Sequence, residues 1–326
     1  MTDTHRTELN IKSKTISPPL ILAPMAGITH SAFRRLIADF GGYGALFTEM
    51  LSARALLQEN LALSPFTRRR ANEGAVIYQI RLGTNDPVEQ AIERLKQVDP
   101  WGIDINLGCP APEIKKIGAG TALFDNREIL APFLSRVRGC WNGPLTVKCR
   151  LGHHAEGWED IFYDRLALFA ECGIDAVTVH PRFSGDKLKR TARSELYRTI
   201  TAALKIPVIA NGDIVDPDAW FEGCGGIMIG RMAVVKPWIF KMDGAYPDYY
   251  EIWERFYRYV NDDFPPEKAI GRIREFTAYY SRNFFYGHEL FRSAQGAKSL
   301  EGLHAKATAF LSKNPRPVAE PSVAGV

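Results

Sequence analysis

Eight short apolar runs, separated by longer amphipathic stretches, occupy the chain between residues 18 and 240. These runs are rich in Val, Ile and Leu and show little polar alternation, which is typical of parallel strands buried on both faces. The predicted strands are Leu20–Ala23, Ala45–Met50, Ala75–Ile80, Gly102–Asn106, Leu145–Arg150, Ala176–His180, Pro207–Asn211 and Gly226–Gly230. Helix-like segments lie between them, for example His30–Phe40, Asp86–Val98, Asp160–Cys172 and Ser194–Leu204.

Eight strand–helix units in this length predict an α/β fold, a (β/α)8 TIM barrel, which typically spans ~250 residues. A doubly wound open sheet is the alternative. The sequence favours the barrel because no GxGxxG pattern follows the first strand.

Four parts are predicted along the chain. Residues 1–17 form an N-terminal extension, 18–243 the barrel, 246–312 a smaller helical domain, and 313–326 a tail without fixed structure. Tyr246-Pro247 marks the domain boundary, and the proline-rich composition of the tail indicates disorder. The helical domain carries a core-facing stripe at near-helical spacing, made of Ile270, Ile273, Phe276, Tyr280 and Phe284.

Composition limits the class of protein. The formal net charge of +4 permits an RNA partner without requiring one. The five cysteines form no CxxC pair and show no metal-ligand spacing, so we expect reduced thiols and no metal site. No apolar run could span a membrane, and residues 1–14 lack the apolar core of a signal peptide. We therefore expect a cytoplasmic protein, and a monomer.

The active site of such a barrel lies at the C-terminal ends of its strands. All eight predicted strands end there in polar, glycine or proline residues, which is more than solubility alone requires. The candidate residues are Pro24, Met25, Ala26, Gly27, Glu49, Gln79, Asn106, Cys109, Lys148, Arg150, His180, Arg182, Asn211, Gly212, Asp213, Gly230 and Arg231.

A phosphate site is predicted where the seventh and eighth strands end. Barrels often bind phosphate there, beside the start of a short helix. Asn211-Gly212-Asp213 follows one strand, and Gly230-Arg231 ends the other ahead of a helix predicted near Val234–Phe240. Arg231 can pair with phosphate, although a plain turn with a surface arginine would also explain each piece alone.

Lys148 lies inside the apolar run Leu145–Arg150. An unpaired buried ammonium is costly, so this side chain must point into the barrel mouth or meet an acidic partner. A structural ion pair is one interpretation. A bound anion or electron-rich ring is the other, and the nearby strand ends at Gln79 and His180 favour it.

Cys109 follows the strand Gly102–Asn106 and precedes Pro110, which stops the strand. A buried apolar role is the commonest for cysteine, and a metal ligand would need a second thiol or suitable histidines. A nucleophile needs a base to form thiolate, whereas a general acid needs only a protonated thiol. The position at a strand tip favours chemistry over packing.

An ordered set of motifs resembles the tRNA-dihydrouridine synthases between residues 20 and 240. The motifs are Leu22-Ala23-Pro24-Met25-Ala26-Gly27, Asn106-Leu107-Gly108-Cys109-Pro110, Gly118-Ala119-Gly120, Lys148-Cys149-Arg150-Leu151-Gly152, Val208-Ile209-Ala210-Asn211-Gly212-Asp213 and Met228-Ile229-Gly230-Arg231. The C-terminal helical part matches in length and position more than in residues.

The resemblance implies an FMN enzyme with NADPH as reductant and tRNA as substrate, held in part by the helical domain. Hydride would pass from reduced flavin to C6 of a uridine, and Cys109 would protonate C5. By matching position, Pro24, Met25 and Ala26 line the flavin, Gln79 and Lys148 contact its ring and His180 lies near it. Asn211, Gly212, Asp213, Gly230 and Arg231 would hold the phosphate end, and Asn106 would face flavin and uracil together. Arg182, after the sixth strand, is a further candidate for contact with the substrate.

Two departures lie where substrate would touch. Ala111-Pro112-Glu113 follows Cys109-Pro110 where the family often has basic residues, and the charged stretch 185–190 follows Arg182. The RNA target therefore stays open. Alternatives are an FMN barrel that acts on a free pyrimidine base, like dihydroorotate or dihydropyrimidine dehydrogenases, and a flavin-free RNA-binding barrel.

Overall fold

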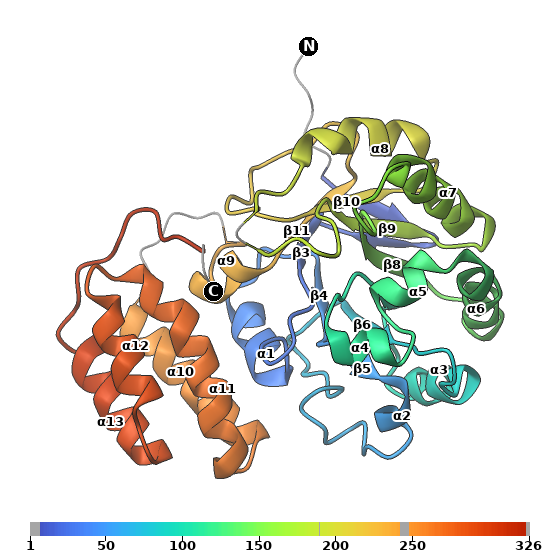
Figure 1. The fold of residues 1–326 in the computed structure, drawn as a ribbon. Coiled ribbons are helices and arrows are strands. Elements are labelled where there is room, and N and C mark those ends of the chain that lie inside the picture. Colours follow the sequence, from blue (N-terminus) through green and yellow to red (C-terminus); the bar gives the residue numbers. More distant parts are fainter. Residues whose placement is uncertain (1–6, 189, 242–247, 324–326) are drawn as a thin grey trace.

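The computed structural model describes residues 7–188, 190–241 and 248–323, and it contains a closed parallel barrel beside a helical domain (Figure 1). The barrel strands pair in parallel in the ring β3-β4-β6-β7-β8-β9-β10-β11, and β11 pairs with β3 to close it. Their bounds are β3 Leu20–Leu22, β4 Ala45–Phe47, β6 Val76–Arg81, β7 Gly102–Leu107, β8 Leu145–Arg150, β9 Ala176–His180, β10 Val208–Asn211 and β11 Gly226–Ile229. The predicted (β/α)8 barrel is confirmed.

Of the second predicted strand, Ala45–Met50, only β4 (Ala45–Phe47) forms. The short β5 (Leu51–Ser52) follows beyond the predicted range, and both β4 and β5 pair with β6. The cause of the early end of β4 is Thr48. Its Oγ1 accepts the backbone N–H of Gln79 at 3.1 Å, in the place of a main-chain carbonyl of a continuous ladder. The chain after β4 therefore leaves the regular strand. This change of direction places Glu49 at the barrel mouth, where its carboxylate accepts the N–H of Gly27.

Helices cover the outside of the barrel at nearly the predicted places. They are α1 Ser31–Phe40, α2 Ala53–Leu56, α3 Val88–Lys96, α4 Pro112–Lys116, α5 Thr121–Asp125, α6 Arg127–Cys140, α7 Trp158–Glu171, η1 Ser194–Leu196, α8 Tyr197–Ala203 and α9 Arg231–Val235. The short helix predicted near Val234–Phe240 is misplaced, because α9 starts directly where β11 ends. The connection 212–225 between β10 and β11 contains turns and no helix.

The N-terminal extension forms a hairpin that the sequence did not predict, made of β1 (Leu9–Ile11) and β2 (Lys14–Ile16). Its buried Leu9, Ile11 and Ile16 share one apolar cluster with inward-facing strand residues such as Ile21 and Ile77. This cluster fills the N-terminal end of the barrel, and the polar inward residues lie toward the opposite end.

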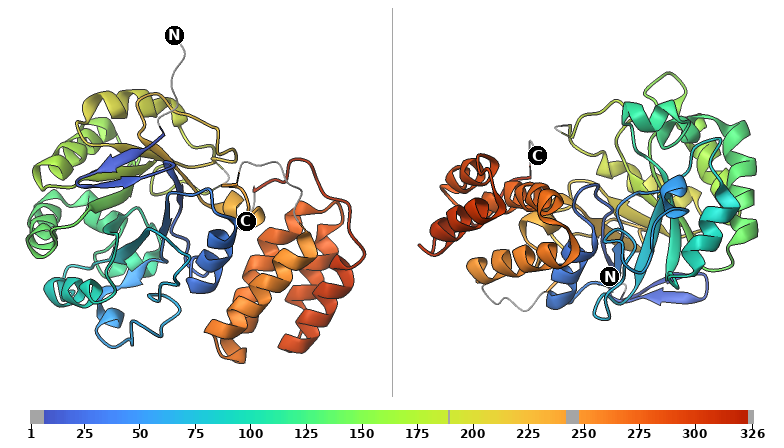
Figure 2. Two further views of the ribbon diagram at one scale, coloured as in Figure 1. Left: turned by 180° about the vertical axis from the view of Figure 1, so that it is seen from behind. Right: turned by 90° about the horizontal axis from the view of Figure 1, so that it is seen from below.

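The helical domain consists of α10 (Tyr249–Asp263), α11 (Pro266–Tyr280), η2 (Ser281–Asn283), α12 (Gly287–Gln295) and α13 (Leu300–Leu311). It lies beside the barrel with α10 and α11 nearest to α1 (Figure 2). The predicted stripe is buried except for Ile270, which is half-buried. The predicted boundary at Tyr246-Pro247 lies outside the described residues.

The C-terminal segment 313–323 is held against the protein, unlike the tail predicted to lack fixed structure. The N–H of Val318 donates to the Asn283 carbonyl at 2.7 Å. Nη1 of Arg231 donates to the Val323 carbonyl at 3.0 Å. A proline-rich segment forms no helix, but its free carbonyls can accept hydrogen bonds from neighbouring elements.

His30 lies at the junction of the two domains. It is fully buried at the start of α1, and its ring centroid is 4.9 Å from that of Phe264 and 6.1 Å from that of Phe256. Neither ring nitrogen has a hydrogen-bond partner among the described residues. Burial, followed by the charges of Arg272 and Arg34, lowers the pKa of His30 well below its usual value.

Replacing His30 by leucine should make folding less sensitive to acid. The unfolded chain takes up a proton at this histidine as pH falls through ~6.5, whereas the folded protein keeps it neutral. The free energy of unfolding therefore decreases as the pH is lowered. For this one group the decrease is at most about 1.4 kcal/mol per pH unit. Denaturant unfolding at about pH 7.5 and about pH 5.5 would test this. His153→Gln, at an exposed histidine, is the control, and equal acid sensitivity in all three proteins would contradict the prediction.

Candidate active site at the barrel mouth

Cys109 lies in the loop after β7 and is half-buried. Its backbone is anchored on both sides. Its N–H, at 3.0 Å, and that of Gly108, at 3.3 Å, donate to Oδ1 of Asn106. The carbonyl of Cys109 accepts the N–H of Thr121 at 3.1 Å. The structure therefore places this thiol on a loop with a defined position at the barrel mouth.

A chain of side-chain hydrogen bonds continues from Asn106 into the barrel. Nδ2 of Asn106 donates to Oε1 of Gln79 at 2.9 Å, and Nε2 of Gln79 donates to Oδ2 of Asp104 at 2.8 Å. Oγ1 of Thr146 donates to Oδ1 of Asp104 at 2.6 Å. Burial, opposed by these bonds and by the charge of Lys148, raises the pKa of Asp104 to about 6.

Asp104 and Thr146 were missed by the sequence analysis. Each lies two residues before a predicted site residue, Asn106 and Lys148, and residues two apart in a strand point to the same face. This two-residue spacing from a predicted site residue could have identified Asp104 and Thr146 as polar residues that face the inside of the barrel.

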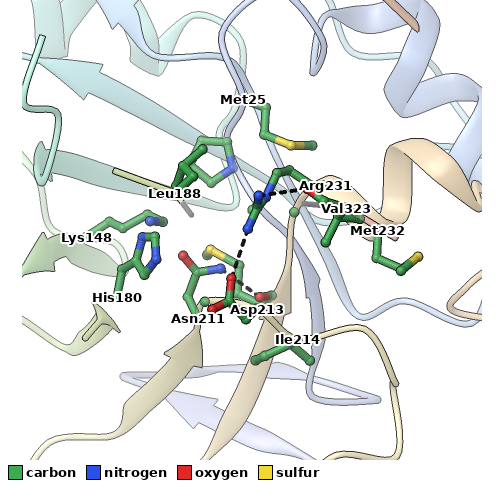
Figure 3. Close-up of a pocket in the computed structure, with 15 residues that line it drawn as sticks. Met25, Lys148, His180, Leu188, Asn211, Asp213, Ile214, Arg231, Met232 and Val323 are labelled. Carbon is green, nitrogen blue, oxygen red and sulfur yellow. Dashed lines mark hydrogen bonds and ion pairs between the residues drawn. The ribbon is translucent and has the colours of Figure 1, made fainter. Parts of the chain in front are cut away.

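A pocket of about 700 Å³, including its open mouth, lies between the ends of β3, β8, β9, β10 and β11 (Figure 3). Predicted site residues that line it are Pro24, Met25, Lys148, His180, Asn211, Gly212, Asp213, Gly230 and Arg231. The predicted site residues that do not line this pocket are Ala26, Gln79, Asn106, Cys109 and Arg182. Gln79 and Asn106 belong to the hydrogen-bonded chain that leads from the Cys109 loop.

Lys148 projects into this pocket next to His180 (Figure 3). Its ammonium makes no hydrogen bond or ion pair with any residue that the structure describes, so the structural ion pair considered from sequence is absent from that part of the chain. Burial, then the charge of Arg150, lowers the pKa of Lys148 to about 8. An ammonium left unpaired in a pocket fits an anionic or electron-rich ligand such as a flavin.

His180 is held neutral. Its Nε2 lies 2.6 Å from Nη1 of Arg182 and accepts from it. Burial, and then the charges of Lys148, Arg150, Arg182 and Arg231, lower the pKa of His180 well below its usual value. A neutral imidazole in this position presents an edge to the pocket without adding to the positive charge.

Arg182 was predicted to contact substrate, but only 1% of its surface is exposed. Its Nη2 pairs with Oδ2 of Asp213 at 2.6 Å, and its Nε donates to the carbonyl of Arg190 at 2.6 Å. The guanidinium is thus occupied within the protein, which favours a structural role beneath the pocket over a substrate contact.

The predicted phosphate end comes together from two strand ends. Gly212 has φ +123°, and a Cβ there would lie 2.7 Å from Cδ2 of His180, so only glycine fits. Oδ1 of Asp213 accepts from Nη2 of Arg231 at 2.9 Å. The side chain of Asn211 is turned away to the backbone carbonyl of Met228, to which its Nδ2 donates at 2.8 Å.

The turn Pro24–Gly27 is held from both domains. The N–H of Gly27 donates to Oε2 of Glu49 at 2.8 Å. Arg272 of α11 lies 4.0 Å from Oε1 of Glu49. Gly27 has φ +82°, and a Cβ there would lie 2.3 Å from Oε2 of Glu275. The helical domain therefore contributes to the mouth, which the sequence analysis did not predict.

Metal binding and membrane crossing are the two remaining possibilities for residues 7–188, 190–241 and 248–323. These residues contain no group of three or more His, Cys, Asp or Glu side chains arranged to hold a metal ion. They also contain no helix with the length and apolar character needed to cross a bilayer.

Comparison with known proteins identifies the family. A family model described as "Dihydrouridine synthase (Dus)" matches residues 21–300. The chain belongs to the dihydrouridine synthase family. It is 31% identical over 319 residues to tRNA-dihydrouridine synthase B of Proteus vulgaris, covering 90% of this chain and 97% of that relative. It is 35% identical over 236 residues to the protein of the same name from Yersinia pestis, covering 70% and 72%. The resemblance found in the sequence is confirmed, and this dihydrouridine synthase family member is an enzyme of the tRNA-dihydrouridine synthase type.

Solved structures agree on the barrel. An old yellow enzyme homologue from Zymomonas mobilis superposes with a TM-score of 0.52 at 12% identity, covering 76% of this chain and 96% of that one. Morphinone reductase superposes with a TM-score of 0.53 at 11% identity, covering 74% and 90%. At such identities the likeness supports the fold of this dihydrouridine synthase family member and nothing finer.

Proposed function

We propose that this enzyme reduces the C5–C6 double bond of a uridine in tRNA to 5,6-dihydrouridine, with bound FMN and with NADPH as the source of electrons. The observation that carries the proposal is the anchored Cys109 loop beside a pocket that holds an unpaired ammonium, in a chain of this family. The curated relatives are named for the same activity on tRNA.

The residues present fit a flavin. Lys148 offers a positive charge without a protein partner, next to the neutral His180. Arg231, Gly212 and Gly230 form the part of the pocket suited to a phosphate. Bound FMN, once reduced, would supply the hydride that is added at C6.

Cys109 would supply the proton that completes the reduction. A thiol carries one S–H hydrogen that it can donate as a general acid. As hydride is added at C6, the S–H bond breaks and the proton is transferred to C5, which leaves a thiolate that regains a proton from water. Cys109 is a free thiol and not part of a disulfide, as this role requires.

The partner is proposed to be tRNA, bound by a single chain across the mouth and the helical domain. In the stretch 187–190, Lys187 is exposed, whereas Arg190 is paired with Asp186 at 3.0 Å and Lys189 lies outside the described residues. The charge of Arg190, which was a candidate for contact with RNA phosphates, is therefore paired with a carboxylate of the protein itself.

The decisive test is product formation. The purified protein, loaded with FMN and given NADPH and tRNA from cells that lack this gene, should convert a uridine to a nucleoside heavier by two hydrogens. Reactions without NADPH are the control, and free uridine and free uracil are tested in parallel. Reduction of uracil but not of tRNA would overturn the proposal in favour of an enzyme for free pyrimidine bases.

A further inference from the structure

Asp104 lies inside the barrel below the Cys109 loop and is fully buried. It is on β7, two residues before Asn106 and on the same face. Its two carboxylate oxygens accept separate hydrogen bonds, from Thr146 and from Gln79. A carboxylate that accepts both bonds offers no hydrogen of its own, whereas an amide offers both donor and acceptor.

This difference sets a direction along the chain. Because Asp104 only accepts, Gln79 must turn its NH₂ group toward it and its Oε1 away. That oxygen can only accept, so Asn106 turns its NH₂ group toward Gln79. The Oδ1 of Asn106 is then left facing the backbone N–H groups of Gly108 and Cys109, which are both donors.

The reverse orientation breaks the last link. If Gln79 rotated its amide by half a turn, its NH₂ group would face the NH₂ group of Asn106. If Asn106 also rotated its amide to avoid this clash of donors, its NH₂ group would face the N–H groups of Gly108 and Cys109. Two backbone donors would lose their acceptor, which destabilises this arrangement because a buried donor without a partner is costly.

We propose that Asp104 is a positioning residue that orients the Gln79 and Asn106 amides and thereby holds the Cys109 loop. The inference rests on the proposed function in that the position of the Cys109 thiol governs proton transfer to the uridine. Asp104 does not touch the reacting atoms. It acts through the side-chain amides of Gln79 and Asn106. A group that only accepts hydrogen bonds, placed where Asp104 lies, fixes which way both amides are turned.

Three variants separate this role from simple packing. Asp104→Leu removes the acceptor and keeps a side chain of similar size. Asp104→Asn keeps one oxygen for Gln79, because its NH₂ group can donate to the Thr146 hydroxyl, and it should restore the chain. Thr146→Val removes the other bond of Asp104 and leaves Gln79 oriented, so it is the matched control.

Loop position is measured first by thiol alkylation with iodoacetamide, read at Cys109 by peptide mass spectrometry. The half-buried Cys140 and Cys172 serve as internal references. We expect Asp104→Leu to raise the alkylation rate at Cys109 by about fivefold or more, because the loop opens more often. Asp104→Asn and Thr146→Val should stay within about twofold of the natural protein.

The rate of tRNA reduction is measured second. Asp104→Leu should slow it by about 10²-fold while the KM for tRNA and the rate of flavin reduction by NADPH change little, since a small misplacement of a reacting group has this effect. If Asp104→Leu fails to fold, Gln79→Met breaks the same chain one link later and must raise the same alkylation.

Two results would overturn the inference: unchanged alkylation at Cys109 in the folded leucine variant, or an asparagine variant as impaired as the leucine variant. Altered alkylation in a protein that does not reduce tRNA would instead leave the positioning role standing and remove the proposed function. The two failures are thus distinguishable.

Discussion

Replacing Cys109 by alanine is expected to lower dihydrouridine formation by about 10²- to 10⁴-fold, the usual contribution of a general acid. Flavin content and the rate of flavin reduction by NADPH should stay close to those of the natural protein. The substitution leaves the loop intact, because both of its anchors use the backbone of Cys109 and not the sulfur. The lost rate would therefore report the proton alone.

Rapid mixing separates the two half-reactions. The flavin of Cys109→Ala is first reduced by NADPH without oxygen, and its slow reoxidation by added tRNA is then followed by absorbance. Cys172→Ala is the matched control, since this half-buried thiol lies at the end of α7 and contacts Ala131 and Ser135. Full activity of Cys109→Ala would remove the proposed proton donor.

Replacing Arg231 by methionine is expected to weaken FMN binding by about 10- to 100-fold, the effect of losing a charge-assisted hydrogen bond of ~1.5–3 kcal/mol. Riboflavin, which lacks the phosphate, should bind the variant and the natural protein with similar affinity. The ratio of the two dissociation constants therefore tests the phosphate contact itself. Fluorescence titration of protein freed of flavin measures both.

Lys236→Met is the control for charge. Lys236 lines the neighbouring cavity and its loss removes the same charge from the same region. It should change FMN affinity far less than the loss of Arg231. If Arg231→Met weakened riboflavin as much as FMN, Arg231 would act through its bonds to Asp213 and Val323 and not through a phosphate.

Local sequence patterns were sufficient to locate the strands of the barrel. All eight barrel strands were predicted within a few residues because a strand buried on both faces leaves a continuous apolar run. The helix after β11 was misplaced by several residues, since nothing in Arg231–Phe240 marks a helix start as clearly as a strand end does. The hairpin β1–β2 was missed because two strands of three residues are too short for a periodic signal.

The site divides in the same way. Cys109, Lys148 and the pair Gly212 and Arg231 could be proposed from sequence. Each lies within two residues of the end of a strand, and the C-terminal ends of parallel strands meet at one mouth. Glu275 could not, since it belongs to the helical domain and reaches Gly27 only after the two domains pack. Arg182 lies two residues beyond the end of β9, yet its guanidinium is bound to Asp213 and to the Arg190 carbonyl.

The sequence by itself determined the barrel, the family and the thiol just after β7. Apolar runs mark the buried strands in order, and short motifs follow their ends. Only the tertiary structure decided which polar groups pair with one another and which stay available to bind a ligand. Asp104 with Gln79, and Arg182 with Asp213, are satisfied internally, whereas Lys148 is left unpaired among the described residues. That outcome depends on distances between strands far apart in the chain, and the cost of burying an unpaired polar group decides which of these contacts form.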